Sequence, residues 1–396
     1  MAHERDALIT GIGLVSCLGS GVGAHWDALN PAGAFTPVLD TESWPPFAVH
    51  PVAPMDLDKQ IPKRGDQRQM EAWQRIGVFA AGLALESAGV KGNTEMLSRA
   101  DLIVCAGGGE RDVAVDATIL SGYPKAANPG LFLNERLQSD LRPTLFLAQL
   151  SNLLAGNISI VHGVIGSSRT FMGEEASGAD AVRIACARIA AGQSEISLVG
   201  GSYNAQRPEV ILHYEMGGLQ RRAPFTGIWA RQADGGGMLL GSLGAFLVIE
   251  SRAHAEARGA TPFARVAAIR SDRCRREPGQ ATANARAQLH SMAAEIDPQG
   301  LGVISGASGA AAVTAEEQAF LAALGYPVRA TATAMGHSLE PAMPANLGLA
   351  AAAVRHGRLF GPLEAAEQAM TAPLTQALVT SWGHWRGEAL ALVTAA

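Results

Sequence analysis

The chain has 396 residues, of which 48% are hydrophobic and 17% are charged, and its net charge is −5. These proportions exclude a disordered chain and indicate a globular protein long enough for two halves or two domains. The mild acidity gives no case for nucleic acid as a partner. The longest apolar run, residues 347–354, is too short to span a bilayer, and "MAHERDALITG" lacks the apolar core of a signal peptide. We therefore expect a soluble, cytoplasmic protein.

Scattered cysteines exclude two further classes of site. Cys17, Cys105, Cys186 and Cys274 form no CxxC pair and no cluster with histidine in the sequence. This spacing predicts neither a disulfide framework nor a zinc site. We therefore expect no metal ion and no cofactor.

The first half of the chain alternates between predicted strands and helices. Apolar runs predict strands, and apolar residues that recur on one face predict helices. Strands are expected over residues 7–16, 101–110 and 196–201, and helices over 73–90, 144–161 and from an elbow at 169–182 to Gly192. Residues 30–70, rich in proline and charge, are interpreted as a cap or an interface segment.

The second half repeats this rhythm. Strands are expected over residues 244–251, 263–269, 301–308, 377–383 and 389–395, and helices over 254–259, 281–296 and 315–325. Such alternation indicates an α/β fold whose sheets are covered on both faces. The similarity of the two halves suggests an internal duplication.

The stretch "RTFMGEEASGADAV" (169–182) joins a predicted strand to a predicted helix. An apolar approach ends in two carboxylates, Glu174 and Glu175, and small residues open the helix. Such an elbow often holds a nucleophile. A carboxylate at this place is favoured by the helix dipole, by roughly 0.3–1 kcal/mol, and can accept backbone N–H groups.

Four stretches resemble the β-ketoacyl synthase family of the thiolase fold, and together they cover nearly the whole chain. They are "ITGIGLVSCLGSGVGAHWDAL" (9–29), the segment 155–201, "GAFLVIESRAHAEARGA" (244–260) and the segment 336–357, which opens on "GHSL". The resemblance implies a five-layered αβαβα sandwich of two duplicated halves, residues 1–243 and 244–396. It also implies a dimer, which we expect to form through the strand "ISLVGG" (196–201).

The catalytic set of this family is degenerate in the sequence. Active members resemble one another in a set of one cysteine and two histidines, and the resemblance assigns these positions to Glu175, Ala307 and His337. A lysine five residues before the second histidine is replaced by Ala332. Because a carboxylate is a poor nucleophile toward a thioester, we do not expect condensation by this chain alone.

Two further segments depart from the family's pattern. In "GHSLEPAM", Glu340 and Pro341 replace residues that let the backbone approach closely. In the gating loop "GHWR", His384 stands at the position of a phenylalanine, and Trp385 and Arg386 stand at glycines. The added bulk predicts a narrowed or closed acyl pocket.

Three interpretations of Glu175 stay open. It is a catalytic acid or base, a cysteine surrogate that fixes the helix end and plugs the pocket, or a surface residue. We favour the surrogate. We expect an ionised carboxylate held by the helix N-terminus, with His337 or His384 as its charged partner, because an unpaired buried charge is costly.

Two basic clusters are candidates for docking an acyl carrier protein, which is acidic. They comprise Lys59, Lys63, Arg64 and Arg68 in one cluster, and Arg273, Arg275 and Arg276 in the other. Solvated surface charge is the alternative interpretation of each cluster.

These features favour a catalytically degenerate β-ketoacyl synthase homologue in fatty acid biosynthesis, which acts like a chain-length factor as the non-condensing partner of an active synthase. The resemblance extends to synthase paralogues linked with the very-long-chain acyl groups of lipid A. One alternative is an active acyltransferase or malonyl decarboxylase that uses Glu175 and His337. Another is a homodimeric acyl-binding protein without turnover.

Overall fold

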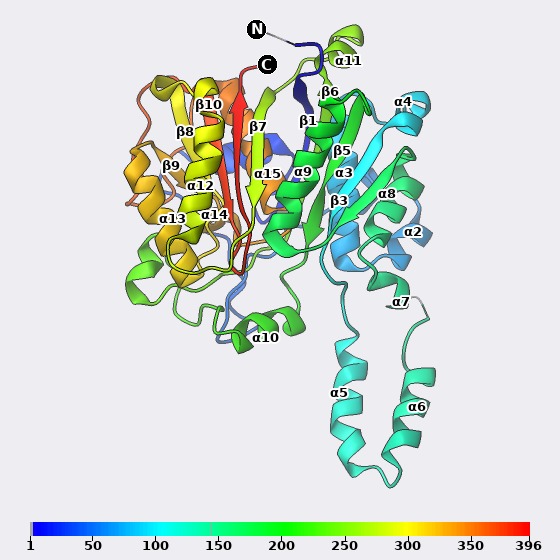
Figure 1. Ribbon diagram of the computed structural model, residues 1–396. Coiled ribbons are helices and arrows are strands. Elements are labelled where there is room, and N and C mark those ends of the chain that lie inside the picture. Colours follow the sequence, from blue (N-terminus) through cyan, green and yellow to red (C-terminus); the bar gives the residue numbers. More distant parts are fainter. Residues whose placement is uncertain (1–2, 144) are drawn as a thin grey trace.

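The computed structural model describes residues 3–143 and 145–396, which form one mixed sheet with helices on its faces (Figure 1). The strands are β1 (Ala7–Ser16), β2 (Gly19–Ser20), β3 (Asp101–Cys105), β4 (Ser168–Phe171), β5 (Ile196–Tyr203), β6 (Leu243–Ser251), β7 (Ala264–Asp272), β8 (Leu301–Ser305), β9 (Val328–Ala330), β10 (Gln376–Trp382) and β11 (Glu388–Thr394).

The helices connect these strands and cover them. They are α1 (Val22–Ala28), α2 (Arg64–Gln69), α3 (Ala72–Ser87), α4 (Thr94–Arg99), α5 (Val113–Gly122), α6 (Pro129–Ser139), α7 (Leu145–Ala148), α8 (Leu153–His162), α9 (Glu174–Ala190), α10 (Pro208–Met216), α11 (Arg252–Ala257), α12 (Gln280–Ser291), α13 (Ala311–Leu324), α14 (Ala332–Met335) and α15 (Ala342–His356). None of the helices in the described part of the chain is long and apolar enough to cross a membrane.

The strand order reads alike from both edges of the sheet. It is β4-β3-β5-β6-β1-β7-β11-β10-β8-β9, with β2 attached to β1. The first three strands from each edge are parallel to one another, and the next two are antiparallel additions. This symmetry groups β1–β6 against β7–β11. We therefore propose that the duplicated halves meet after Ser251, whereas a division at residue 244 assigns β6 to the C-terminal half.

The layers follow the predicted αβαβα order. Helices α3 and α8 cover one side of the first group of strands, and α12 packs on β7 and β11 and α13 on β10 in the second group. Helices α9 and α15 contact each other and strands of both groups, so they form the middle layer. Residues 343–354 of α15 are all buried. This burial explains why the helix carries mainly small and apolar side chains on every face.

Most predicted elements are present, although the strands expected over 101–110 and 301–308 end at Cys105 and Ser305. The single helix expected over 144–161 is two helices, α7 and α8, separated by residues 149–152; residue 144 lies outside the described part. The predicted dimer strand "ISLVGG" is wrong as an edge, because β5 is hydrogen-bonded to β3 on one side and to β6 on the other. The strand that bounds this side of the sheet is β4.

Helices α5 and α6 form an arm that projects from the body of the molecule (Figure 1). They pack mainly against each other and the turn between them. Val115 is the buried residue of α5, and of the described residues of α6 none is buried. Apolar side chains stand exposed along the arm: Val113, Leu120, Tyr123, Leu131 and Leu137.

Candidate functional site

The elbow between β4 and α9 is built from two residues in the left-handed region. Gly173 has φ 130° and Glu174 has φ 57°. The glycine is required there because a side chain is strained at such an angle. The turn directs Glu175, the second residue of α9, into the protein, where only 1% of the residue is exposed.

Three donors converge on one oxygen of Glu175. The Nε2–H of His337 donates to Oε1 at 2.7 Å, and the Nδ1–H of His384 donates to the same oxygen at 2.9 Å. The backbone N–H of His384 is a third donor, at 3.1 Å. The other oxygen, Oε2, is buried and has no hydrogen-bond partner among the described residues. Glu175 therefore lies at the centre of a Glu–His–His cluster.

The predicted partner of the carboxylate is present, but the predicted helix-end contact is not. Gly173, the residue before α9, has no side chain to cap the helix, and among the described residues no backbone N–H of α9 donates to Glu175. The backbone donor comes instead from His384, in the turn between β10 and β11. Glu175 is thus held by the far half of the chain and not by its own helix.

The charges of this cluster support each other. Burial alone raises the pKa of Glu175, but the charge of His384 and the hydrogen bonds from both imidazoles outweigh it and hold the pKa well below its ordinary value. Burial lowers the pKa of His384, yet Glu175 outweighs that effect and the net shift is upward. The two imidazoles therefore favour the ionised form of the carboxylate.

The other positions that the family resemblance singles out are tightly packed. Ala307, Ala332 and His337 are all buried. His337 and Ala332 border a void of about 10 Å³, close to the space of one water molecule. Ala307 is not among the residues that line this void. Glu175 is not among the residues that line this void either.

Arg276 holds the turn that carries His384. Its guanidinium donates to the carbonyl oxygens of Gly383 and Gly387 (3.2 Å for the latter) and pairs with the fully buried Glu388. Gly383 is also needed here, because a Cβ at this position lies 3.1 Å from Glu175 Oε2 and 2.2 Å from the carbonyl oxygen of Arg386. The predicted docking role of Arg276 does not fit this inward orientation.

Glu340 is a second buried carboxyl near the site. Burial raises its pKa to about 7, with the charge of Glu175 adding to the rise. Its Oε2 has no partner among the described residues. Pro341, the next residue, is the N-cap of α15. We expected Glu340 and Pro341 to keep the backbone here from approaching its neighbour closely. The approach is nevertheless close, because a Cβ added to Gly178 of α9 would lie only 2.2 Å from the carbonyl oxygen of Glu340.

A cavity of about 780 Å³ lies beside the cluster. Glu174, Glu340, Trp385 and Arg386 are part of its wall. Trp385 lines this cavity but is 68% exposed, so most of its side chain faces solvent. Trp385 and Arg386 therefore border a cavity of considerable volume, and the narrowing predicted from them stays a prediction.

The other predicted docking residues lie on the surface. Lys63, Arg64 and Arg68 are exposed on or beside α2. Arg273 and Arg275 are exposed after β7, and Arg273 pairs with Asp180 of α9 at 3.1 Å. The structure leaves both groups on the outside of the molecule.

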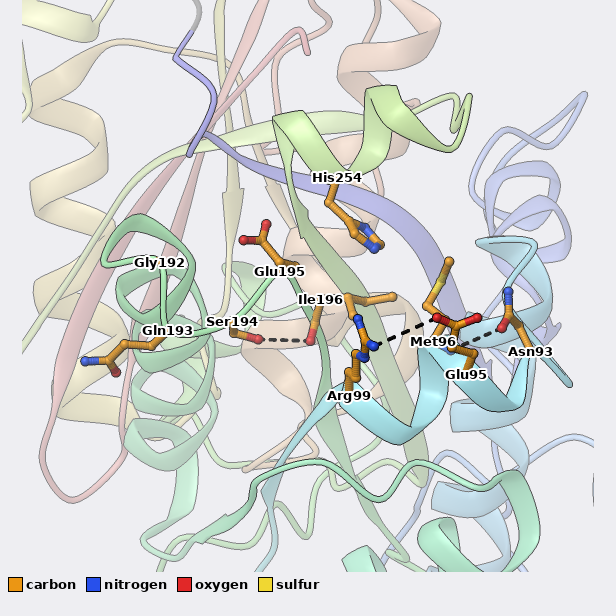
Figure 2. A pocket seen from close by; sticks show the side chains of 10 residues that line it. All are labelled: Asn93, Glu95, Met96, Arg99, Gly192, Gln193, Ser194, Glu195, Ile196 and His254. Carbon is orange, nitrogen blue, oxygen red and sulfur yellow. Dashed lines mark hydrogen bonds and ion pairs between the residues drawn. The ribbon is translucent and has the colours of Figure 1, made fainter.

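A different cavity, of about 450 Å³, lies at the opposite end of β5 (Figure 2). Ile196, which begins β5, lines it, whereas Tyr203, which ends β5, lines the cavity beside the cluster. Its polar groups pair locally, for example Arg99 with Glu95 at 3.9 Å. It contains none of the predicted site residues.

Two contributors to the site were missed from the sequence. The Nε2 of His384 lies 3.7 Å from Glu174, so the second carboxylate of the elbow also faces the cluster. Tyr214 of α10 packs edge-on against the ring of His384, with centroids 5.4 Å apart. The adjacency of Glu174 to Glu175 signals the first contact, but no sequence pattern marks the second.

One relative and two solved structures show what the chain is similar to. The 3-oxoacyl-[acyl-carrier-protein] synthase 2 of Vibrio cholerae is 26% identical over 270 residues, which cover 66% of this chain and 62% of the relative. The ishigamide ketosynthase/chain length factor superimposes with a TM-score of 0.78 at 19% identity and 99% coverage of both chains. A type II polyketide acyl carrier protein in complex with its ketosynthase gives a TM-score of 0.74 at 18% identity, covering 99% of this chain and 100% of that one.

These likenesses differ in what they establish. Structural similarity below 25% identity shows a shared fold, which here is the thiolase fold of ketosynthases. The sequence in addition matches the family described as β-ketoacyl synthase, N-terminal domain, over residues 4–255. The chain therefore belongs to the β-ketoacyl synthase family.

Proposed function

We propose that this chain is a non-condensing β-ketoacyl synthase homologue that works in fatty acid or polyketide synthesis as the chain-length-factor-like partner of an active synthase. The observation that carries the proposal is the cluster at the nucleophile position: an ionised, buried Glu175 held by His337 and His384. This arrangement is closed, and it leaves neither a thiol nor a free imidazole at the elbow.

The chemistry of the cluster argues against condensation. A carboxylate forms an anhydride with an acyl group and does not replace a thiolate as acceptor from a thioester. Its negative charge repels the enolate formed by decarboxylation of a malonyl group. Ala307 and Ala332 supply no donor to stabilise that enolate. A partner with a complete catalytic set has to supply these groups.

The surfaces available to such a partner are the β4 edge and the arm. β4 ends the sheet and leaves one side of its backbone without a strand. The arm presents exposed apolar side chains on the same half of the molecule. We propose that a synthase subunit, or a second copy of this chain, pairs along β4. The solved ketosynthase/chain length factor supports an assembly of these two kinds of subunit by its name, and the exposed edge of β4 is our reason for placing it there.

An acyl carrier protein is the second proposed partner. The exposed groups Lys63, Arg64 and Arg68, and Arg273 and Arg275, complement an acidic surface. The solved complex of a type II polyketide acyl carrier protein with its ketosynthase supports this class of partner. The very-long-chain, lipid A pathway remains a finer proposal that only the overall resemblance supports.

Intact-protein mass spectrometry tests the proposal. The chain is incubated with acyl and malonyl carrier proteins, alone and together with a candidate synthase from the same organism. We expect no acyl adduct and no released carbon dioxide from the chain alone, and condensation or a changed product length when the synthase is added. An acyl adduct or decarboxylation by the isolated chain, lost in Glu175→Gln, overturns the proposal in favour of an enzyme.

The cavity of about 780 Å³ supports a second candidate, an acyl-binding protein without turnover. The same experiment distinguishes it. Native mass spectrometry that finds a long acyl ligand bound stoichiometrically to the isolated chain, with no change on adding any synthase, favours this candidate.

A further inference from the structure

The Glu–His–His cluster brings together three metal-ligand side chains from distant parts of the sequence. Glu175 comes from the start of α9, His337 from the turn after α14, and His384 from the turn between β10 and β11. One ligand atom of each lies within 4.8 Å of those of the other two. A search of the sequence for closely spaced cysteines and histidines cannot detect such a site, because its members are more than 40 residues apart.

The donor set has a defined chemical preference. Two imidazole nitrogens and one carboxylate oxygen are ligands of Zn²⁺ and of Fe²⁺ in two-histidine, one-carboxylate sites. Such ions lie roughly 2.0–2.2 Å from nitrogen and oxygen ligands. The ligand atoms then stand somewhat further apart than the present contacts of 2.7 and 2.9 Å. Binding of an ion therefore requires the two rings to move outward from Glu175.

Two details of the cluster point to a cation. All three donors contact Oε1 of Glu175, and the buried Oε2 of the same carboxylate has no partner among the described residues. The second nitrogen of His384 faces the carboxylate of Glu174 at 3.7 Å. An outer carboxylate on the far nitrogen of a ligating histidine is a recurrent feature of metal sites, since it fixes the ring and raises its basicity.

The charge and access of the cluster also suit a divalent ion. On binding, such an ion takes the place of the protons that His337 and His384 direct at Glu175, so its positive charge faces the carboxylates of Glu174 and Glu175 instead. Glu174 and Trp385, the chain neighbours of two of the ligands, line the cavity of about 780 Å³, so an ion can arrive from that side. The cluster thus has ligands, an outer carboxylate and a route of entry.

We propose that Glu175, His337 and His384 bind a single divalent transition-metal ion of the zinc and iron(II) class, with Glu174 as the outer carboxylate that orients His384. The proposal goes beyond the non-condensing function and does not depend on it. It concerns the binding of an ion and adds no reaction step.

Cobalt(II) is the probe. The full chain, purified without a polyhistidine tag and treated with a chelator, is titrated with Co²⁺, and the visible ligand-field absorption is recorded and then displaced with Zn²⁺. We expect a saturable absorption with one Co²⁺ per chain. A chain that is folded by circular dichroism and develops no absorption overturns the proposal without the use of any variant.

Variants then locate the ion. Glu175→Gln and His384→Ala are expected to abolish the absorption, and Glu174→Gln to weaken Co²⁺ binding by about tenfold or more. His213→Ala is the matched control, because His213 lines the same cavity but lies outside the cluster. If the control loses the absorption while Glu175→Gln and His384→Ala keep it, the ion lies elsewhere and the proposal fails. Failure here leaves the condensation experiment unaffected, because no acyl group takes part.

Discussion

At the scale of single residues, the site is defined by one substitution and the partners it needs. A carboxylate at the head of a buried helix requires opposite charge, because burial without a partner is costly. His337 and His384 donate hydrogen bonds to it across 162 and 209 residues of sequence, and Glu175 raises the pKa of His384. Glu175 therefore has a structural role whatever else it does.

Glu175→Gln tests that structural role. The amide keeps the shape but removes the charge that both imidazoles face, so we expect a loss of roughly 1–3 kcal/mol in the free energy of unfolding. Urea unfolding at neutral pH in the presence of a chelator measures it. Glu174→Gln is the control, since that side chain is 34% exposed and should change stability much less. Equal stability of Glu175→Gln and wild type contradicts the paired carboxylate.

Glu175→Cys tests whether the nucleophile alone is missing. We expect no condensation from this single variant, because Ala307 and Ala332 still lack the imidazole and the ammonium group of active family members. Product formation from acyl and malonyl carrier proteins is the readout. A rate near that of an ordinary synthase would show that the rest of the site is intact and that our account of the degeneracy is wrong.

At the scale of elements, single contacts between segments hold the turns around the site. Arg276 is 15% exposed in its side chain, Glu388 is fully buried, and the pair fixes the turn from Gly383 to Gly387. Arg276 adopts a left-handed φ of 61°, which a residue with a side chain tolerates only when its contacts compensate. The position of His384 thus depends on a residue more than 100 positions away.

Arg276→Ala removes this support. Because it leaves Glu388 buried without its cation, we expect a destabilisation of about 3–5 kcal/mol. The matched control is Arg275→Ala, an exposed neighbour that should stay within about 0.5 kcal/mol of wild type. Thermal or urea unfolding of wild type and the two variants measures these stabilities. A similar loss of stability in Arg276→Ala and Arg275→Ala would show that Arg276 does not hold the turn.

A second junction predicts a pH dependence. Glu250, at the end of β6, is contacted by Thr10 of β1, by His254 of α11 at 2.6 Å and by Arg258 at 2.7 Å. Burial opposes the shift, but these partners lower the pKa of Glu250 from 4.5 to about 2. A lowered pKa in the folded state means that the stabilisation is complete above pH 4.5 and is lost as the pH falls toward 2.

The expected size of that loss is about 3 kcal/mol. Wild type and Glu250→Gln are unfolded in urea at several values of pH, and the difference in their stabilities should shrink as the pH is lowered through this range. A difference that does not change with pH assigns the acid sensitivity to other carboxyl groups.

Elements of strong local pattern were predictable, and contacts between distant elements were not. The ten-residue apolar run of β1 and the one-sided apolar pattern of α3 are local, so their bounds were found within a few residues. The break between α7 and α8 and the exposed arm are set by tertiary packing and carry no apolar period. The family resemblance predicted that Glu175 and His337 belong to one site. That both imidazoles contact the same oxygen of Glu175 could be seen only in the three-dimensional structure.

At the scale of the whole molecule, the mirrored strand order leaves β4 as one edge of the sheet and β9 as the other. The carbonyls of Ser167 and Phe171 accept hydrogen bonds from the β3 side, at 2.9 and 3.0 Å. Because alternate residues of a strand bond to opposite sides, the N–H of Thr170 points away from the sheet. It is available to a partner strand.

Thr170→Pro tests association through this edge. Proline removes the outward N–H and leaves the pairing of β4 with β3 in place, so we expect weaker association with the partner and an unchanged fold. Thr170→Val keeps the N–H and serves as control. Multi-angle light scattering and co-purification with the candidate synthase measure association. Full assembly of the proline variant places the interface elsewhere.

The projecting arm of α5 and α6 has a consequence for how such a protein changes over generations. Its helices lean on each other more than on the core, so substitutions along the arm cost the fold little. Substitutions in the arm can therefore accumulate after a gene duplication without unfolding the protein. In the proposed pairing, such substitutions could change which subunit the copy binds. Under the pairing proposed above, which uses the arm together with the β4 edge, a family member whose elbow no longer supports condensation could keep its place in the pathway while its arm adapts to a different partner.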